Sequence, residues 1–301
     1  MIKNPIILVC SHKKFNILQN EILKPIQVGA IGKESLYNLR DDLGDNISAK
    51  NEKFCELTAM YWAWKNLPSH YDYVGFFHYR RYLSFRVERL YKRFFPKIKF
   101  LSYFLHKFNE ENILKLCNDY DILMIQKESF TSNYILNDST LERFKNFIQS
   151  FFFYNKELQD IFLNILFKKY PQSKNYTNEL LFGTSHRGYF YSKNMFIMKR
   201  EYFNQYMNFL FDVLFELENE LNLLHNQHLP QNRRFGYIAE LMINIFLNSI
   251  ITSKPTIKEL HLIKAFNLDL SNTYFKKQFY KIKERLNINY IKFLFFKLKG
   301  K

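Results

Sequence analysis

Five consecutive residues, His78, Tyr79, Arg80, Arg81 and Tyr82, bring one imidazole and two guanidinium groups together directly after an apolar run. Arginine forks match phosphate oxygens, and two of them can neutralise a diphosphate without a metal ion. An ordinary exposed Arg–Arg pair is the alternative, but the position at the end of a buried strand favours a functional role. We therefore expect Arg80 and Arg81 to bind a diphosphate group, with His78 beside them.

A second candidate is one carboxylate in an apolar segment. Glu240 lies early in a predicted helix at 237–248 that is otherwise rich in Ile, Leu, Met and Phe. Apolar surroundings raise the pKa of a carboxyl group, which suits a general base. A solvent-facing glutamate is the alternative. We take Glu240 as the candidate catalytic base, with His78 as its competitor.

A third cluster of polar residues begins the predicted helix at 54–66. A helix N-terminus presents free N–H donors, so these residues could cap the helix or bind the base or ribose of a nucleotide. The candidates for nucleotide binding are Asn51, Glu56 and Thr58.

The common signatures GxGxxG, GxxxxGK[ST], HExxH and GxSxG are absent. Asp119-Tyr120-Asp121 has the spelling of a metal-binding DxD motif but precedes its strand, and Asn267-Leu268-Asp269 has one carboxylate only. No metal ligand is therefore assigned, although the sequence leaves a divalent ion open. A metal-dependent transferase that uses Asp45 or Asp121 is an enzymatic alternative.

Apolar runs alternate with segments of helical spacing along the chain. Because the polar clusters fall at the carboxyl ends of the predicted strands, the pattern predicts an open α/β sheet with its site at that edge. His12, which follows the first strand, belongs to the same edge. The expected strands are 6–10, 26–30, 73–77, 121–125 and 194–198, and the longer expected helices are 54–66, 141–166, 201–224 and 237–248.

Composition sets the broad class. The chain has 301 residues, of which 47% are hydrophobic, enough for a sizeable core and against a disordered chain. Three cysteines without a CxxC pair exclude a disulfide framework and a cysteine zinc site. No run reaches the ~18–20 apolar residues of a membrane span, and no signal peptide is expected. The pattern predicts a cytoplasmic protein, soluble or peripheral on the membrane.

The net charge of +16 is concentrated in two basic segments rich in aromatic residues, about 86–108 and 272–301. Such segments suit an anionic bilayer surface. A solvated basic tail and a nucleic-acid contact are the alternatives. We expect one domain at 1–265 with a basic insert at about 86–108, followed by a basic helical membrane-associating tail at 266–301.

Several long strings, taken in order, closely resemble the DUF4422 family of bacterial capsule and lipopolysaccharide glycosyltransferases over roughly residues 5–265. The strings are GDNIS (44–48), KN (50–51), CELTAMYWAWKN (55–66), VGFFHYRRY (74–82), NMFIMK (194–199) and RFGY (234–237). The sequence departs from the usual family pattern at Gln27, at Ala239 and over residues 191–193.

This resemblance implies a GT-A-like (Rossmann-like) open mixed sheet flanked by helices. It also implies sugar transfer, galactofuranosyl or galactosyl, from a nucleotide sugar such as a UDP-sugar to a glycan or lipid-linked acceptor in capsule, lipopolysaccharide or lipooligosaccharide synthesis. The candidate donor-binding residues are Lys50, Asn51, Glu56, Thr58, Arg80, Arg81 and His12. The candidate acceptor-side residues are Asn194, Arg234, Phe235 and Gly236. An anionic membrane surface is an expected partner and nucleic acid is not. The rival class is a non-enzymatic basic protein that binds membrane or nucleic acid.

Overall fold

The computed structural model describes residues 3–15, 17, 19–85, 110–129, 142, 146–152, 154–183, 189–223 and 232–264. The chain divides into two units, Met1–Ala265 and Phe266–Lys301, and every described residue belongs to the first. The predicted basic insert, the predicted tail and the Asn267–Asp269 string lie outside the described residues.

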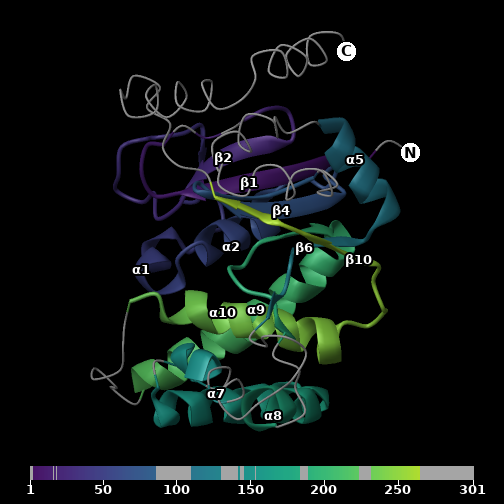
Figure 1. The fold of residues 1–301 in the computed structure, drawn as a ribbon. Coiled ribbons are helices and arrows are strands. Elements are labelled where there is room, and N and C mark those ends of the chain that lie inside the picture. The colour runs from purple at the N-terminus through teal and green to yellow at the C-terminus, as the bar shows by residue number, and fades with distance from the viewer. Residues whose placement is uncertain are drawn as a thin grey trace, which may run out of the picture. The chain divides into compact units, whose positions relative to one another are not determined.

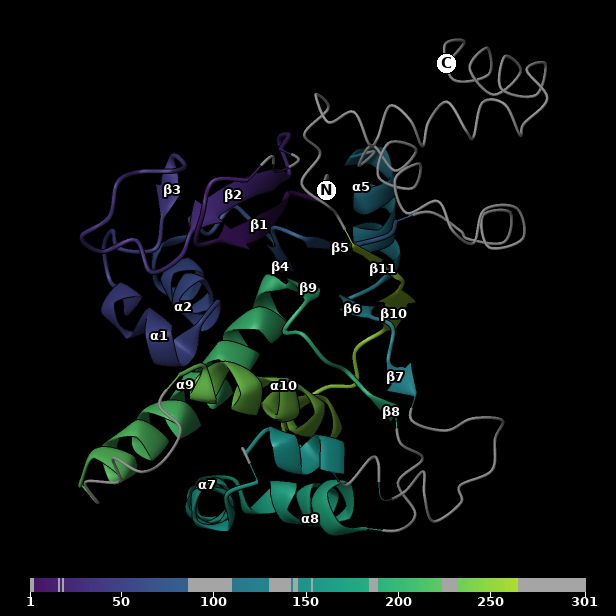
Figure 2. The same ribbon diagram turned by 60° about the vertical axis from the view of Figure 1, so that its left-hand side comes forward.

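A mixed sheet organises the described residues, with the strand order β10-β6-β9-β4-β1-β2-β3 (Figures 1 and 2). The pairs β3–β2, β2–β1 and β1–β4 are parallel, β9 runs antiparallel between β4 and β6, and β10 is parallel to β6. Strands β5 and β11 extend the sheet beyond β4. The strand bounds are β1 Pro5–Ser11, β2 Leu23–Gln27, β3 Leu39–Arg40, β4 Tyr73–His78, β5 Arg81–Leu83, β6 Ile122–Ile125, β9 Phe196–Lys199, β10 Ile257–Leu260 and β11 Leu262–Lys264, with β7 Glu128–Ser129 and β8 Tyr189–Phe190 in a separate pair. The predicted open α/β sheet is confirmed.

The central strands are apolar on both faces because helices cover both sides of the sheet. Every residue of β1 and β6 is buried, as are the first five residues of β4. Figures 1 and 2 show α1, α2, α9 and α10 on one side of the sheet and α5 on the other. A strand buried on both faces is a continuous apolar run, which is why sequence alone could find these strands.

The helices beneath the sheet pack in pairs, α1 against α10, α2 against α9 and α7 against α9. Among the described residues, no helix is long and apolar enough to cross a membrane. The helix bounds are α1 Asn51–Phe54, α2 Leu57–Asn66, α5 Glu110–Asp119, α7 Lys156–Lys169, α8 Lys174–Phe182, α9 Arg200–Leu223 and α10 Arg234–Ile245, with short helical turns at Ser48–Lys50, Pro171–Ser173 and Phe246–Ile250.

Two predicted helices are interrupted. The helix expected at 54–66 breaks at Cys55, whose φ of +53° and ψ of −131° end α1 before α2 begins. The expected helix at 141–166 also breaks, since the amide oxygen of Asn155 accepts the Leu158 N–H and starts α7 anew. A side-chain cap of this kind begins a helix wherever the preceding chain turns away.

The strand predicted at 26–30 is displaced. Strand β2 covers Leu23–Gln27, and the chain after it turns through Gly29. Gly29 has a φ of +59°, and a Cβ there would lie 2.6 Å from Asn51 Oδ1. Glycine is required at this point for both the conformation and the close approach.

Candidate active site

A cleft of about 370 Å³ opens at the carboxyl ends of β1 and β4, between those strands and the starts of α1 and α10. Its lining brings together most of the residues that the sequence singled out. The lining residues are Cys10, His12, Val28, Asn51, Glu52, Cys55, Glu56, His78, Tyr79, Arg80, Arg81, Arg233 and Glu240.

The residues His78–Tyr82 form a tight hairpin. Strand β4 ends at His78, Tyr79 and Arg80 make the turn, and Arg81 begins β5, paired with His78. Arg80 and Arg81 are exposed, so both guanidinium groups stand at the cleft without the desolvation that a buried charge suffers. The hairpin therefore presents cations at the carboxyl edge, as expected from the sequence.

Three exposed cationic or ionisable residues, His12, Arg80 and Arg233, form what we call the cationic rim of the cleft. Tyr79 supports it, because the Arg80 guanidinium lies 4.8 Å from the Tyr79 ring centroid and the His12 ring meets it edge-on at 5.5 Å. Burial lowers the pKa of His12, and the positive charges of Lys13, Arg80, Lys33 and Arg233 lower it further. A point at which several cations repel one more proton is a point that attracts an anion.

Arg233 is the rim residue that sequence reasoning missed. It precedes α10 in the left-handed conformation, with φ +61°, and its N–H donates to Glu52 O at 2.8 Å. Arg234, which was chosen instead, is buried in the first turn of α10. The sequence does carry a signal for Arg233. Two adjacent arginines at the amino end of a helix place positive charge at the positive end of the helix dipole, and this favours an anion nearby.

The half-buried residues Glu56, His78 and Glu240 form what we call the carboxylate floor of the cleft. Burial raises the pKa of Glu240 to about 7; the charge of Glu56 acts in the same direction, whereas the Lys193 N–H and the charge of Arg81 oppose the rise. A carboxyl group that titrates near neutrality can accept and release a proton at physiological pH.

Of the remaining donor-side candidates, Asn51 lines the cleft, whereas Thr58 and Lys50 do not. Asn51 lines the cleft, and its amide donates to Cys55 O at 2.7 Å and to Thr58 Oγ1 at 3.0 Å. Thr58 is fully buried and donates to Cys55 O, so it holds the break between α1 and α2. Lys50 does not line the cleft, because its amine pairs with Glu218 of α9 at 2.5 Å.

The acceptor-side candidates mostly pack behind the cleft. Asn194 is buried and donates to Glu56 Oε1 at 2.8 Å and Gly236 O at 3.0 Å. Phe235 is buried against the ring of Phe54. A Cβ on Gly236 would lie 3.2 Å from Cys55 Cβ, so glycine lets α10 approach α1 closely.

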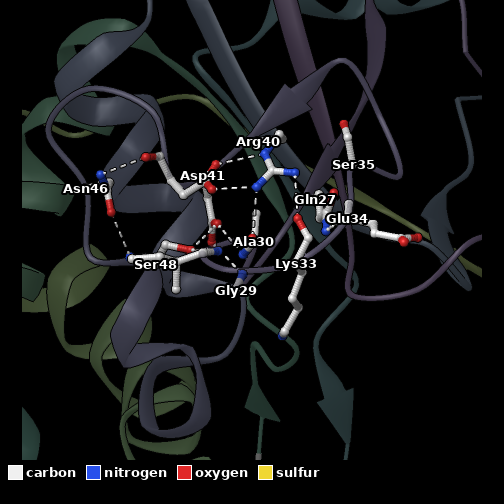
Figure 3. A network of polar contacts seen from close by, with 12 residues as sticks. Gln27, Gly29, Ala30, Lys33, Glu34, Ser35, Arg40, Asp41, Asn46 and Ser48 are labelled. Carbon is white, nitrogen blue, oxygen red and sulfur yellow. Dashed lines mark hydrogen bonds and ion pairs between the residues drawn. The ribbon is translucent and has the colours of Figure 1, made fainter.

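The loops after β2 and β3 are braced by a buried carboxylate (Figure 3). Asp41 accepts hydrogen bonds from the N–H groups of Gly29 and Ala30 and from the Ser48 hydroxyl. Gln27, one of the departures from the family pattern, is buried outside the cleft lining and bonds to Glu34 O and Leu36 N. This network fixes the chain that supplies Val28 and Asn51 to the cleft.

The carboxylates of the metal-dependent alternative are engaged elsewhere. Asp45 accepts from the Tyr61 hydroxyl, and Asp121 precedes β6, where it pairs with Lys199 and Thr256. In the part of the chain that the structure describes, no three His, Cys, Asp or Glu side chains gather to hold a metal ion. The cleft itself is lined by the cationic side chains of Arg80, Arg81 and Arg233.

The model of the family described as "Domain of unknown function (DUF4422)" matches residues 6–251. The chain belongs to the DUF4422 family. Among curated proteins, none matches it. A solved apo structure of WbbM, a bifunctional glycosyltransferase, resembles it with 28% identity and a TM-score of 0.65, over 88% of this chain and 46% of that one. The chain thus spans about half the length of WbbM, and its sheet and helices have a GT-A-like fold.

Proposed function

We propose that this DUF4422 chain is a glycosyltransferase that moves a sugar from a nucleotide-sugar donor to a glycan acceptor. One observation carries the proposal: a single cleft combines a cationic rim with a carboxylate whose pKa is raised to about 7. The first feature suits a diphosphate and the second suits proton removal from a hydroxyl. Both lie at the sheet edge where open α/β folds bind their ligands.

The donor diphosphate is assigned to the rim and the adjacent hairpin. Arg80, Arg81 and Arg233 line the cleft and supply guanidinium forks. As the bond between the anomeric carbon and the diphosphate oxygen breaks, negative charge grows on the leaving group. Cations held in place before the reaction stabilise that charge without reorganisation.

The acceptor hydroxyl is assigned to Glu240. Its oxygen attacks the anomeric carbon, the new carbon–oxygen bond forms as the diphosphate leaves, and the proton passes to the Glu240 carboxylate. A base with a pKa near 7 is ionised in a large fraction of molecules at neutral pH yet basic enough to take the proton.

His78 is the competing base, and its hydrogen bond fixes which of its two ring nitrogens could accept a proton. Its Nε2 lies 2.8 Å from Lys193 O, and a carbonyl oxygen only accepts, so Nε2 carries the proton. Only Nδ1 is then left to accept a proton. We assign His78 to hydrogen bonding beside the leaving group and Glu240 to proton transfer.

We further propose galactofuranosyl or galactosyl transfer from a UDP-sugar, to a glycan or lipid-linked acceptor in capsule, lipopolysaccharide or lipooligosaccharide synthesis. This rests on the DUF4422 resemblance.

Peripheral attachment to the inner face of the cytoplasmic membrane is a separate proposal, and it rests on the lysine-rich, aromatic sequence of 272–301. If so, deletion of 272–301 moves the protein from anionic liposomes to the soluble fraction. An intact protein that ignores such liposomes at low salt would contradict the attachment.

The experiment for the central proposal is a thermal-shift screen of nucleotide sugars, followed by a hydrolysis and transfer assay of each hit. We expect one UDP-sugar to raise the melting temperature and to be consumed. UDP alone should also stabilise the fold, because the rim binds the diphosphate. No stabilisation by any nucleotide or nucleotide sugar would favour the rival class of non-enzymatic basic binding proteins.

A further inference from the structure

Two consecutive residues between β8 and β9 adopt a left-handed backbone. Lys193 has a φ of +72° and Asn194 a φ of +48°. Asparagine tolerates this region moderately well, but lysine gains nothing from it. Backbone strain of this kind persists only where its surroundings enforce it, and it gathers at functional sites.

This turn contacts all three residues of the carboxylate floor. The Lys193 N–H donates to Glu240 Oε2 at 2.6 Å, and the Lys193 carbonyl accepts from His78 Nε2 at 2.8 Å. The Asn194 amide donates to Glu56 Oε1 at 2.8 Å. The three floor residues come from α10, β4 and the start of α2, and this turn contacts all three of them.

The turn is held from outside the cleft. The Lys193 amine forms an ion pair with Glu128, and the Ser192 hydroxyl donates to the same carboxylate at 2.9 Å. On the other side, the Asn194 amide also donates to Gly236 O at 3.0 Å, at the close contact of α10 with α1. Glu128 does not line the cleft, so its effect on the floor passes through the turn.

We propose that the left-handed Lys193–Asn194 turn is the positioning element of the floor: its main chain fixes Glu240 and His78, its asparagine amide fixes Glu56, and the Glu128–Lys193 ion pair holds the turn in place. The inference rests on the proposed glycosyl transfer and deepens it. Lys193 and Asn194 act through Glu240, His78 and Glu56, so they are positioning residues. A misplacement of about 1 Å at a reacting group can cost ~10²-fold in rate.

The test compares two substitutions at one position. Lys193→Gly keeps the N–H and carbonyl and accepts a positive φ, whereas Lys193→Val keeps both groups but disfavours that φ. We expect Lys193→Val to lower kcat by ~10–100-fold with donor Kd within a few-fold of wild type. Lys193→Gly keeps the turn but loses the ammonium and its ion pair with Glu128, so its kcat should fall only several-fold. Equal losses in the two variants would overturn the conformational role.

The second readout is the titration of Glu240, followed by NMR of ¹³C-carboxyl-labelled glutamate and assigned with Glu240→Gln. The hydrogen bond from the Lys193 N–H stabilises the ionised carboxylate, so losing this bond and the Lys193 charge in Lys193→Val should move the titration to higher pH. Lys193→Gly keeps that hydrogen bond but loses the charge of the Lys193 ammonium, which also lowers the pKa of Glu240, so its titration should shift less in the same direction. An unchanged titration in folded Lys193→Val would contradict the proposal.

Glu128→Gln covers the case in which Lys193→Val does not fold. It weakens the ion pair from outside the cleft, so we expect a kcat loss of several-fold, unchanged donor Kd and a smaller shift of the Glu240 titration in the same direction. Wild-type behaviour in both measurements would overturn the proposal. Failure of the proposed glycosyl transfer can be distinguished from failure of this positioning role. In that case wild type would consume no nucleotide sugar, but the titration of Glu240 could still be measured in each variant.

Discussion

Asp121 and Glu240 lie at opposite ends of the parallel strands, and their surroundings shift their pKa values in opposite directions. Asp121 precedes β6 at the edge where the parallel strands begin. Although burial acts to raise its pKa, hydrogen bonds from Lys199 and Thr256 lower it overall. Glu240 lies at the edge where β1 and β4 end, and burial there raises its pKa to about 7.

The difference follows from what each carboxylate faces. Asp121 receives two hydrogen bonds from Thr256, its N–H at 2.8 Å and its hydroxyl at 2.7 Å, together with the Lys199 ion pair. Within the described part of the chain, the Glu240 carboxylate accepts one such hydrogen bond, from the Lys193 N–H, and it faces a cleft that also holds Glu56. A carboxylate surrounded by donors stabilises the fold, whereas one left short of donors is ready for proton transfer.

The largest expected effect is the loss of turnover in the variant Glu240→Gln. Glutamine keeps the shape and can still accept the Lys193 N–H, but it cannot take a proton. We expect turnover to fall by ~10²–10⁴-fold, the usual range for a lost general base, while calorimetry shows unchanged donor binding.

Stability is the control for that variant. With its pKa raised, Glu240 binds more protons in the folded chain, so its contribution to folding weakens as pH rises from about 4.5 to about 7. At pH 8, Glu240→Gln should therefore melt no lower than wild type. Turnover within a few-fold of wild type would exclude Glu240 as the base and make His78→Gln the next variant.

The next largest effect is on donor affinity. Arg80→Ala and Arg81→Ala should each weaken donor binding by ~1.5–3 kcal/mol, the scale of a lost charge-assisted hydrogen bond. Lys156→Ala, on the exposed start of α7, removes the same charge away from the cleft and should leave the affinity unchanged. If calorimetry finds unchanged donor affinity in both arginine variants, the assignment of the diphosphate to the rim and hairpin is contradicted.

The smallest effect is on stability at the opposite edge. Asp121→Asn should lower the free energy of unfolding by ~1–2 kcal/mol at pH 7, since it loses the ion pair with Lys199 and sets an amide against two donors. The lowered pKa means that this contribution is present above about 3.8 and lost as pH falls further. Urea unfolding at pH 7 and pH 3 measures the difference. A turnover loss per folded molecule would contradict the division between the two edges.

The same comparison explains how much the sequence could predict. The strands β1, β4 and β6 were predictable because burial on both faces leaves unbroken apolar runs. The hairpin cations and Glu240 were predictable because charge stood out against those runs. Local pattern therefore located the side chains to which we assign the chemistry.

The supporting geometry was not predictable. Lys50 resembles a donor ligand in sequence, but its partner Glu218 lies 168 residues away. The breaks at Cys55, Lys193 and Arg233 need positive φ at residues other than glycine, which sequence does not signal. Such conformations are imposed by tertiary contacts, and these contacts are the ones that join the floor residues.

The most direct measurement of the account is the pH dependence of kcat/KM for wild type with its preferred donor. If Glu240 is the base, kcat/KM rises with pH along a limb centred near 7 in the free enzyme and then levels off. A rate that is independent of pH between about 5 and 8, or a limb that persists in the residual activity of Glu240→Gln, would contradict it.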